Sequence, residues 1–100
     1  MAKTSKFDAA DYLKTPEQIA AYLTEALETG DTAFLCTALD TIARAKGMSS
    51  VAKATGLGRE SLYKSLSGNS KPEFDTIAKV VQSFGVKLVA QPIEDETKAA

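Results

Sequence analysis

Residues 48–68 read MSSVAKATGLGRESLYKSLSG, and this stretch decides the fold class of the 100-residue chain. Gly56 can take the positive φ that a sharp turn between two short helices requires. Ala52 is small enough for the two helices to cross closely, and Leu57 and Leu62 are spaced to enter the core. This pattern is typical of a helix-turn-helix, in which the second helix enters the major groove of DNA.

The second helix of this motif, predicted over 58–66, is expected to carry polar side chains on the face that core packing leaves free. Arg59 suits a bidentate contact with guanine, and Glu60 can accept from cytosine or exclude the wrong base. Tyr63 either packs on a thymine methyl group or covers the edge of the core. The predicted DNA-binding residues are Ser49, Arg59, Glu60, Ser61, Tyr63 and Lys64. Among them, Ser49, Ser61 and Lys64 suit phosphate or mixed contacts.

Capping signals and helical spacing predict further helices around the motif. Thr15 and Gln18 form a capping box for a helix that Gly30 ends. Asp31 caps the next helix, and Ser49 caps the first helix of the motif. A last helix follows, with a predicted core face of Phe74, Ile77, Ala78, Val81 and Phe84.

Residues 86–90 are apolar and partly β-branched, which predicts a short C-terminal β-strand. A single strand has no pairing partner within the chain, so we expect it to pair across the axis of a homodimer. The predicted fold class is all-α, with five helices and this one strand. The predicted boundaries are an N-terminal arm at 1–14, the helix-turn-helix domain at 15–92 with its motif at 49–66, and a flexible acidic tail at 93–100.

The net charge of −1 conceals an uneven distribution. Residues 1–45 hold four Lys and Arg against seven Asp and Glu, a net charge of −3. Residues 46–79 hold six against three, a net charge of +3. This split favours two partners, one anionic and one cationic. The alternative is ordinary scatter of charge over solvated helix faces.

The composition argues against catalysis and metal binding. The chain has no histidine and a single cysteine, so the commonest general base is missing and a structural zinc site is not expected. We therefore predict neither an enzyme nor a cofactor or metal. Cys36, beside Phe34 and Leu35, is expected to be a small hydrophobic residue in or near the core. No apolar run approaches the roughly 20 residues of a membrane span, which predicts a cytoplasmic protein without a membrane partner.

Three stretches carry a family resemblance: FDAADYL at 7–13, GMSSVAKATGLGRESLYKSLSG at 47–68 and KPEFDTIAKVVQSFGVKL at 71–88. Together they resemble the probable addiction module antidote proteins, HigA-like antitoxins with a Cro/C1-type (lambda-repressor-like) helix-turn-helix. The resemblance implies a type II antitoxin that neutralises a RelE-superfamily toxin, an mRNA-cleaving ribonuclease, and represses its own operon at operator DNA. Gly58 stands where the family commonly has a serine or threonine cap, which implies a modest DNA affinity.

The surface that would hold the toxin is predicted from charge alone. An acidic N-terminal half suits a cationic toxin, and the predicted toxin-binding residues are Asp11, Glu17, Glu25 and Glu28. An apolar contact through Phe7, Tyr12 and Leu13 is the alternative.

Two other functions stay open at this point. One is a stand-alone phage-type Cro/C1 transcriptional repressor without a toxin partner. The other is a helical interaction module that does not bind DNA, which salt-dependent DNA affinity would contradict.

Overall fold

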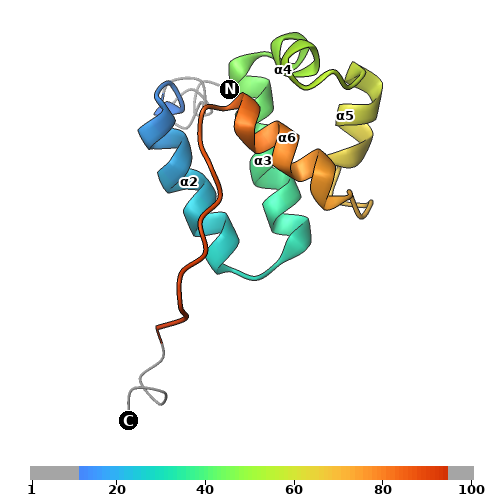
Figure 1. Ribbon diagram of the computed structural model, residues 1–100. Coiled ribbons are helices and arrows are strands. Elements are labelled where there is room, and N and C mark those ends of the chain that lie inside the picture. The colour runs from blue at the N-terminus through green and yellow to red at the C-terminus, as the bar shows by residue number, and fades with distance from the viewer. Residues whose placement is uncertain (1–11, 95–100) are drawn as a thin grey trace, which may run out of the picture.

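The computed structural model describes residues 12–94, which form an all-α domain (Figure 1). Its five helices are α2 (Pro16–Glu28), α3 (Thr32–Lys46), α4 (Met48–Thr55), α5 (Arg59–Ser65) and α6 (Phe74–Ser83). Helix α2 packs against α3, and α4 contacts α3, α5 and α6. Figure 1 shows α6 crossing in front of α3, with α4 and α5 at the side of the domain away from α2. The all-α class agrees with the sequence prediction.

The first two described helices begin at the predicted caps. Thr15 Oγ1 accepts a hydrogen bond from the Gln18 N–H at 3.1 Å, and Gln18 Oε1 accepts one from the Thr15 N–H at 3.1 Å. Asp31 Oδ1 accepts from the N–H groups of Ala33 and Phe34. These bonds satisfy backbone donors that a helix start otherwise leaves open, and they confirm both start signals.

A glycine turn separates α4 from α5. Gly56 adopts a left-handed conformation with φ +77°, and its N–H donates to the Ala52 carbonyl at 2.9 Å. Gly58 is the N-cap of α5 and offers no side-chain hydrogen bond. The predicted cap at Ser49 is wrong, because α4 begins at Met48, and Gly47, two residues before Ser49, takes the cap position. Ser49 instead lies exposed in the first turn of α4.

All five described helices contribute buried side chains to the core, and Met48 and Val51 come from α4. Leu62 and Leu66 at α5 are buried with Ile42 of α3 and Phe84 after α6. Cys36 is also buried, as predicted, at 1% exposure, and burial raises the pKa of its thiol. Leu57 packs against this cluster from the α4–α5 turn. The helix-turn pair is therefore anchored by apolar residues, which leaves its polar residues on the outside.

The predicted C-terminal β-strand is wrong. Within residues 12–94 there is no strand, and 86–94 has no regular secondary structure. No backbone hydrogen bond joins 86–94 to another described segment. A strand needs a neighbour for its N–H and C=O groups, and the β-branched composition of 86–90 does not supply one.

Phe74 also departs from the prediction. Its side chain is 72% exposed, whereas Val81 and Phe84 of the same predicted face are buried and Ile77 and Ala78 are half-buried. Phe74 has the correct helical period, but it occupies the first turn of α6, at the end of the helix that lies away from α2 (Figure 1). Periodicity gives the direction of a side chain and does not show how far along the helix the core extends.

Candidate functional site

Helix α5 presents polar side chains to solvent and apolar ones to the core. Leu62 is fully buried. The exposed α5 residues are Arg59, Glu60, Ser61 and Lys64, and Tyr63 is half-buried. Ser49 of α4 is exposed as well. All six residues predicted to bind DNA are therefore at least partly accessible.

Two guanidinium groups lie close to the ring of Tyr63. The Cζ atom of Arg59 lies 5.8 Å from the ring centroid, and the Arg59 Nη2 group donates to the Tyr63 hydroxyl at 3.4 Å. The Cζ atom of Arg44, from α3, lies 4.9 Å from the same centroid. Both distances are within the range of a cation–π interaction. Tyr63 therefore contacts Arg44 and Arg59, the two arginines of the chain.

Asp40 fixes the arginine that comes from α3. Arg44 Nε donates to Asp40 Oδ2 at 2.7 Å, one helical turn back along α3. The hydrogen bond and the charge of Asp40 raise the pKa of Arg44 above its already high ordinary value. The guanidinium thus stays charged, with one side held by a carboxylate and its Cζ above an aromatic ring.

The structure brings Arg59 and Tyr63 together and adds Arg44 and Asp40, which the sequence reasoning missed. The spacing of Asp40 and Arg44 is a readable i,i+4 signal for an ion pair. The approach of Arg44 to Tyr63 is a contact between α3 and α5, which are separated in the sequence, so no local pattern predicts it. Among the described residues, no ion pair or side-chain hydrogen bond involves Glu60, Ser61 or Lys64 with one another.

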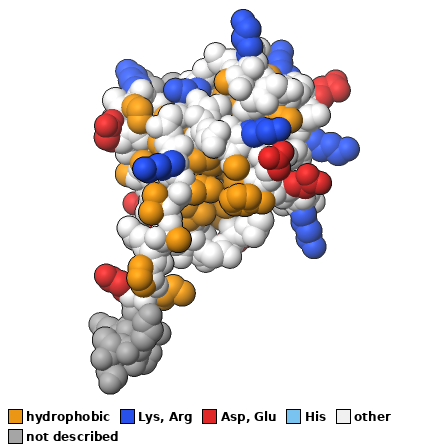
Figure 2. Space-filling model, in the orientation of Figure 1, with side chains coloured by type: hydrophobic (Ala, Val, Ile, Leu, Met, Phe, Trp, Pro, Cys, Tyr) orange, Lys and Arg blue, Asp and Glu red, His pale blue; other side chains and the backbone are white. Residues whose placement is uncertain are grey.

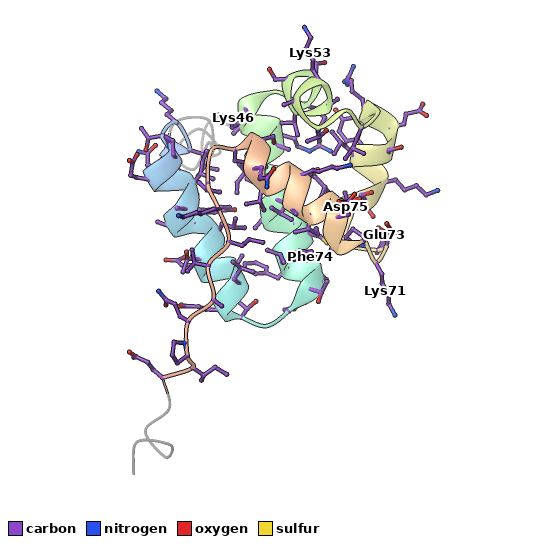
Figure 3. All side chains as sticks on the ribbon, viewed as in Figure 1. Lys46, Lys53, Lys71, Glu73, Phe74 and Asp75 are labelled. Carbon is purple, nitrogen blue, oxygen red and sulfur yellow. The ribbon has the colours of Figure 1, made fainter. Side chains whose placement is uncertain are left out.

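Further lysines lie around the helix pair. Figure 3 shows Lys53 pointing away from α4, Lys46 at the end of α3 and Lys71 in the loop after α5. Figure 2 shows Lys and Arg side chains projecting along the edge that α4 and α5 form. Lys53 and Lys71 therefore add exposed positive charge to the elements that precede and follow α5.

Three of the four acidic residues predicted to bind a toxin share one face of α2. At 100° per residue, Glu17, Glu25 and Glu28 fall within about 80° of each other. All three are exposed, while Ile19 and Leu23 on the other side are buried. No Lys or Arg pairs with them in the described part of the chain. Asp11, the fourth predicted residue, lies outside the described residues.

A shallow open hollow of about 380 Å³ lies beside this acidic face, lined by Tyr12, Gln18, Ala21, Tyr22 and Glu25. The rings of Tyr12 and Tyr22 meet edge to face with centroids 6.1 Å apart. Leu13 is buried, so the alternative apolar contact through Phe7, Tyr12 and Leu13 loses one of its members. Phe7 lies outside the described residues. Tyr12 remains accessible at 43% exposure.

Residues 12–94 contain neither a metal-binding cluster nor a membrane-spanning helix. Within 12–94, no three His, Cys, Asp or Glu side chains gather in a group that could hold a metal ion. None of the described helices is both long and apolar enough to cross a membrane.

The fold and these surfaces define a small all-α protein with a polar short helix and a separate acidic helix face. The chain matches the family described as "Probable addiction module antidote protein" over residues 3–92, and it belongs to this family. It is also 40% identical over 85 residues to an uncharacterized protein of Haemophilus influenzae strain Rd, an alignment that covers 85% of this chain and 88% of that protein. No solved structure matches the chain. An antidote protein of an addiction module has a toxin as its partner, which makes this chain an antitoxin.

Proposed function

We propose that the chain is the antitoxin of a type II module, that it binds and neutralises a RelE-superfamily ribonuclease, and that it represses its own operon at operator DNA. It acts in the cytoplasm as a binding protein, not as an enzyme. The observation that carries the DNA-binding part is the polarity of α5. Arg59, Glu60, Ser61 and Lys64 are exposed while Leu62 between them is buried, and α5 lies within the most basic segment of the chain.

On DNA, α5 lies in the major groove, and the pair α4–α5 acts as a helix-turn-helix. Arg59 and Glu60, in the first turn of α5, read base edges, and Tyr63 supports them. Ser49, Ser61 and Lys64 hold the phosphate backbone. The glycine turn at Gly56 supports this arrangement because it lets two short helices meet at a sharp angle.

The toxin lies against the acidic face of α2. Glu17, Glu25 and Glu28 are exposed on one side of that helix without cationic partners among the described residues, so a basic protein gains charge complementarity there. Asp11 extends the same acidic half of the chain. Because α2 lies across the domain from α5 (Figure 1), toxin and DNA can be bound together.

Operator binding by one small domain yields few base contacts, and we propose a homodimer that reads two half-sites. The C-terminal segment supplies the interface, because Leu88, Val89 and Ile93 are all exposed in it. Figure 2 shows a continuous area of hydrophobic side chains between this segment and α6, and Phe74, labelled in Figure 3, lies at the start of α6. An apolar area shared by an extended segment and a helix start can meet its own copy across a two-fold axis.

The test of the antitoxin role is growth of a bacterial host in which the neighbouring open reading frame is induced with and without this chain. We expect arrest by the neighbour alone and recovery when the chain is co-expressed. Arrest without recovery contradicts neutralisation. The absence of arrest favours a stand-alone repressor.

The toxin surface is tested by charge reversal. Changing Glu17, Glu25 and Glu28 to lysine should weaken toxin binding at low salt and abolish rescue of growth. The matched control reverses Glu73, an exposed glutamate that precedes α6, and should leave toxin affinity unchanged. Equal affinity of the triple variant and the native chain contradicts the proposed surface.

Operator binding is tested with DNA from upstream of the gene. The logarithm of the affinity should fall linearly with the logarithm of salt concentration, and Arg59→Ala should reduce the preference for this DNA over a scrambled duplex. A chain that shows no salt-dependent DNA affinity is an interaction module without DNA binding.

A further inference from the structure

The contacts of Tyr63 separate it from the other polar residues of α5. Its ring is half-buried and has Arg44 at 4.9 Å and Arg59 at 5.8 Å, and its hydroxyl accepts from Arg59. A ring held in this way is not free to turn toward a thymine methyl group. It is placed to hold the side chain of Arg59 in one orientation.

Arg44 is the second member of this arrangement. It lies on α3, outside the helix-turn pair, and the carboxylate of Asp40 fixes its Nε at 2.7 Å. A guanidinium that is held by a carboxylate stacks on a ring with less loss of rotamer freedom than a free one. Since Asp40 is only 24% exposed at its side chain, the anchor itself is partly embedded in the surface of α3.

We infer that Asp40, Arg44 and Tyr63 form a positioning array that orders Arg59 before DNA is bound, with Arg44 as a positioning residue for base recognition. This inference rests on the DNA-binding role proposed above. Ordering a long side chain on binding costs affinity, and an arginine that is already ordered avoids this cost. Arg44 thus acts on sequence preference through Arg59 and makes no base contact of its own.

The composition of the chain allows a direct measurement without DNA. Because Arg44 and Arg59 are the two arginines, Arg44→Met leaves one arginine Nε signal in a ¹H–¹⁵N spectrum, that of Arg59. In the native chain we expect the heteronuclear NOE of the Arg59 Nε to be close to that of the backbone. Arg44→Met should lower it toward the value of a freely rotating side chain, and Tyr63→Phe should lower it partly, because the ring remains and the hydroxyl acceptor is lost. If the Arg59 side chain is as mobile in the native chain as in Arg44→Met, the inference is wrong, whether or not the chain binds DNA.

The effect on DNA binding is tested by a double-mutant cycle of Arg44→Met and Arg59→Ala. Affinity is measured for the upstream DNA and for a scrambled duplex of equal length. Arg44→Met alone should weaken binding to the upstream DNA by about two- to tenfold, with a smaller effect on the scrambled duplex. In the Arg59→Ala background, Arg44→Met should cause no further loss of preference. Lys79→Met is the matched control, since Lys79 is an exposed cation of an i,i+4 ion pair with Asp75 on α6.

Two outcomes contradict the positioning role. Arg44→Met could weaken both duplexes equally and do so equally in the Arg59→Ala background, which would make Arg44 an independent phosphate contact. It could also leave the affinity for both duplexes at the native value. A native chain that binds neither duplex rejects the proposed DNA-binding function instead, and the NMR comparison then decides separately whether the array orders Arg59.

Discussion

Thr15 and Gln18 cap each other at the start of α2, with side-chain oxygens that each accept from the other's backbone N–H at 3.1 Å. Gln18 Oε1 also accepts from the Lys14 N–H at 2.8 Å. Thr15→Ala should lower the free energy of unfolding by about 1 kcal/mol, because the Gln18 N–H in the first turn loses its acceptor. Chemical denaturation measures this change.

The control for this cap is Thr24→Ala, on the exposed side of the same helix. Alanine favours a helix interior, so this change should be neutral or stabilise by a few tenths of a kcal/mol. Equal losses in the two variants would show that the cap contributes nothing. Because Glu17, Glu25 and Glu28 depend on α2 for their common face, Thr15→Ala should also weaken the toxin interface modestly.

Gly56 and Gly58 flank the α4–α5 turn and should respond oppositely to substitution. A Cβ added at either position meets nothing within 4 Å, so conformation decides the outcome. Gly56→Ala should destabilise by about 1–2 kcal/mol, because its φ of +77° is strained for an L-residue. Gly58→Ser, at φ −73°, should stabilise by a few tenths of a kcal/mol through a new N-cap hydrogen bond.

Thermal unfolding of both glycine variants measures the difference, and titration of Gly58→Ser with the upstream DNA extends it. A serine hydroxyl at the start of α5 can also reach a phosphate, so affinity should rise in this variant. A stability gain in Gly56→Ala would show that the turn does not require its left-handed residue.

Local signals in the sequence were sufficient to predict most of the helical fold. The cap at Asp31, the capping box at Thr15 and the stop at Gly56 depend on hydrogen bonds between residues close in the chain, so a local pattern predicts them. Leu62 was expected in the core because α5 must bury one face, and it is fully buried.

Features that depend on distant partners were not predictable in the same way. The prediction of a strand at 86–90 is wrong because composition describes a residue's preference and not the presence of a neighbouring strand. Arg44 was missed because its approach to Tyr63 is a contact between residues far apart in the sequence, which no local pattern predicts. The toxin-binding residues stay a prediction, although the common face of Glu17, Glu25 and Glu28 on α2 follows from helical spacing alone.

Cys36 should be unreactive toward thiol reagents in the folded protein at neutral pH. Its side chain is buried, and burial raises the pKa of the thiol, so less thiolate is present and access is blocked. Because the folded-state pKa is above the unfolded one, the contribution of this group to stability is complete below about pH 8.5 and is lost as pH rises toward the folded-state pKa. The difference in unfolding free energy between the native chain and Cys36→Ala should therefore shrink in alkaline solution. A constant difference from pH 7 to pH 10 would contradict the burial of the thiol.

Phe74 should matter for self-association and little for the stability of the single domain. Phe74→Ser removes a ring that is 72% exposed, so the free energy of unfolding of the isolated domain should change by less than about 0.5 kcal/mol. Phe84→Ala, at the buried end of the same helical face, should cost about 3–5 kcal/mol. If Phe74 lies in a homodimer interface, Phe74→Ser should shift the monomer–dimer equilibrium toward monomer in sedimentation experiments.

Leu88→Ser provides the second half of this test, because Leu88 is an exposed residue of the C-terminal segment. Reciprocal packing of this segment against the start of α6 predicts that either change alone weakens the dimer and that their effects are not additive. The melting temperature of the native chain should rise with protein concentration, and this dependence should diminish in both variants. The native chain could instead show a monomeric mass and a melting temperature that is independent of concentration. This result would indicate that the apolar area binds the toxin and not a second copy of the chain.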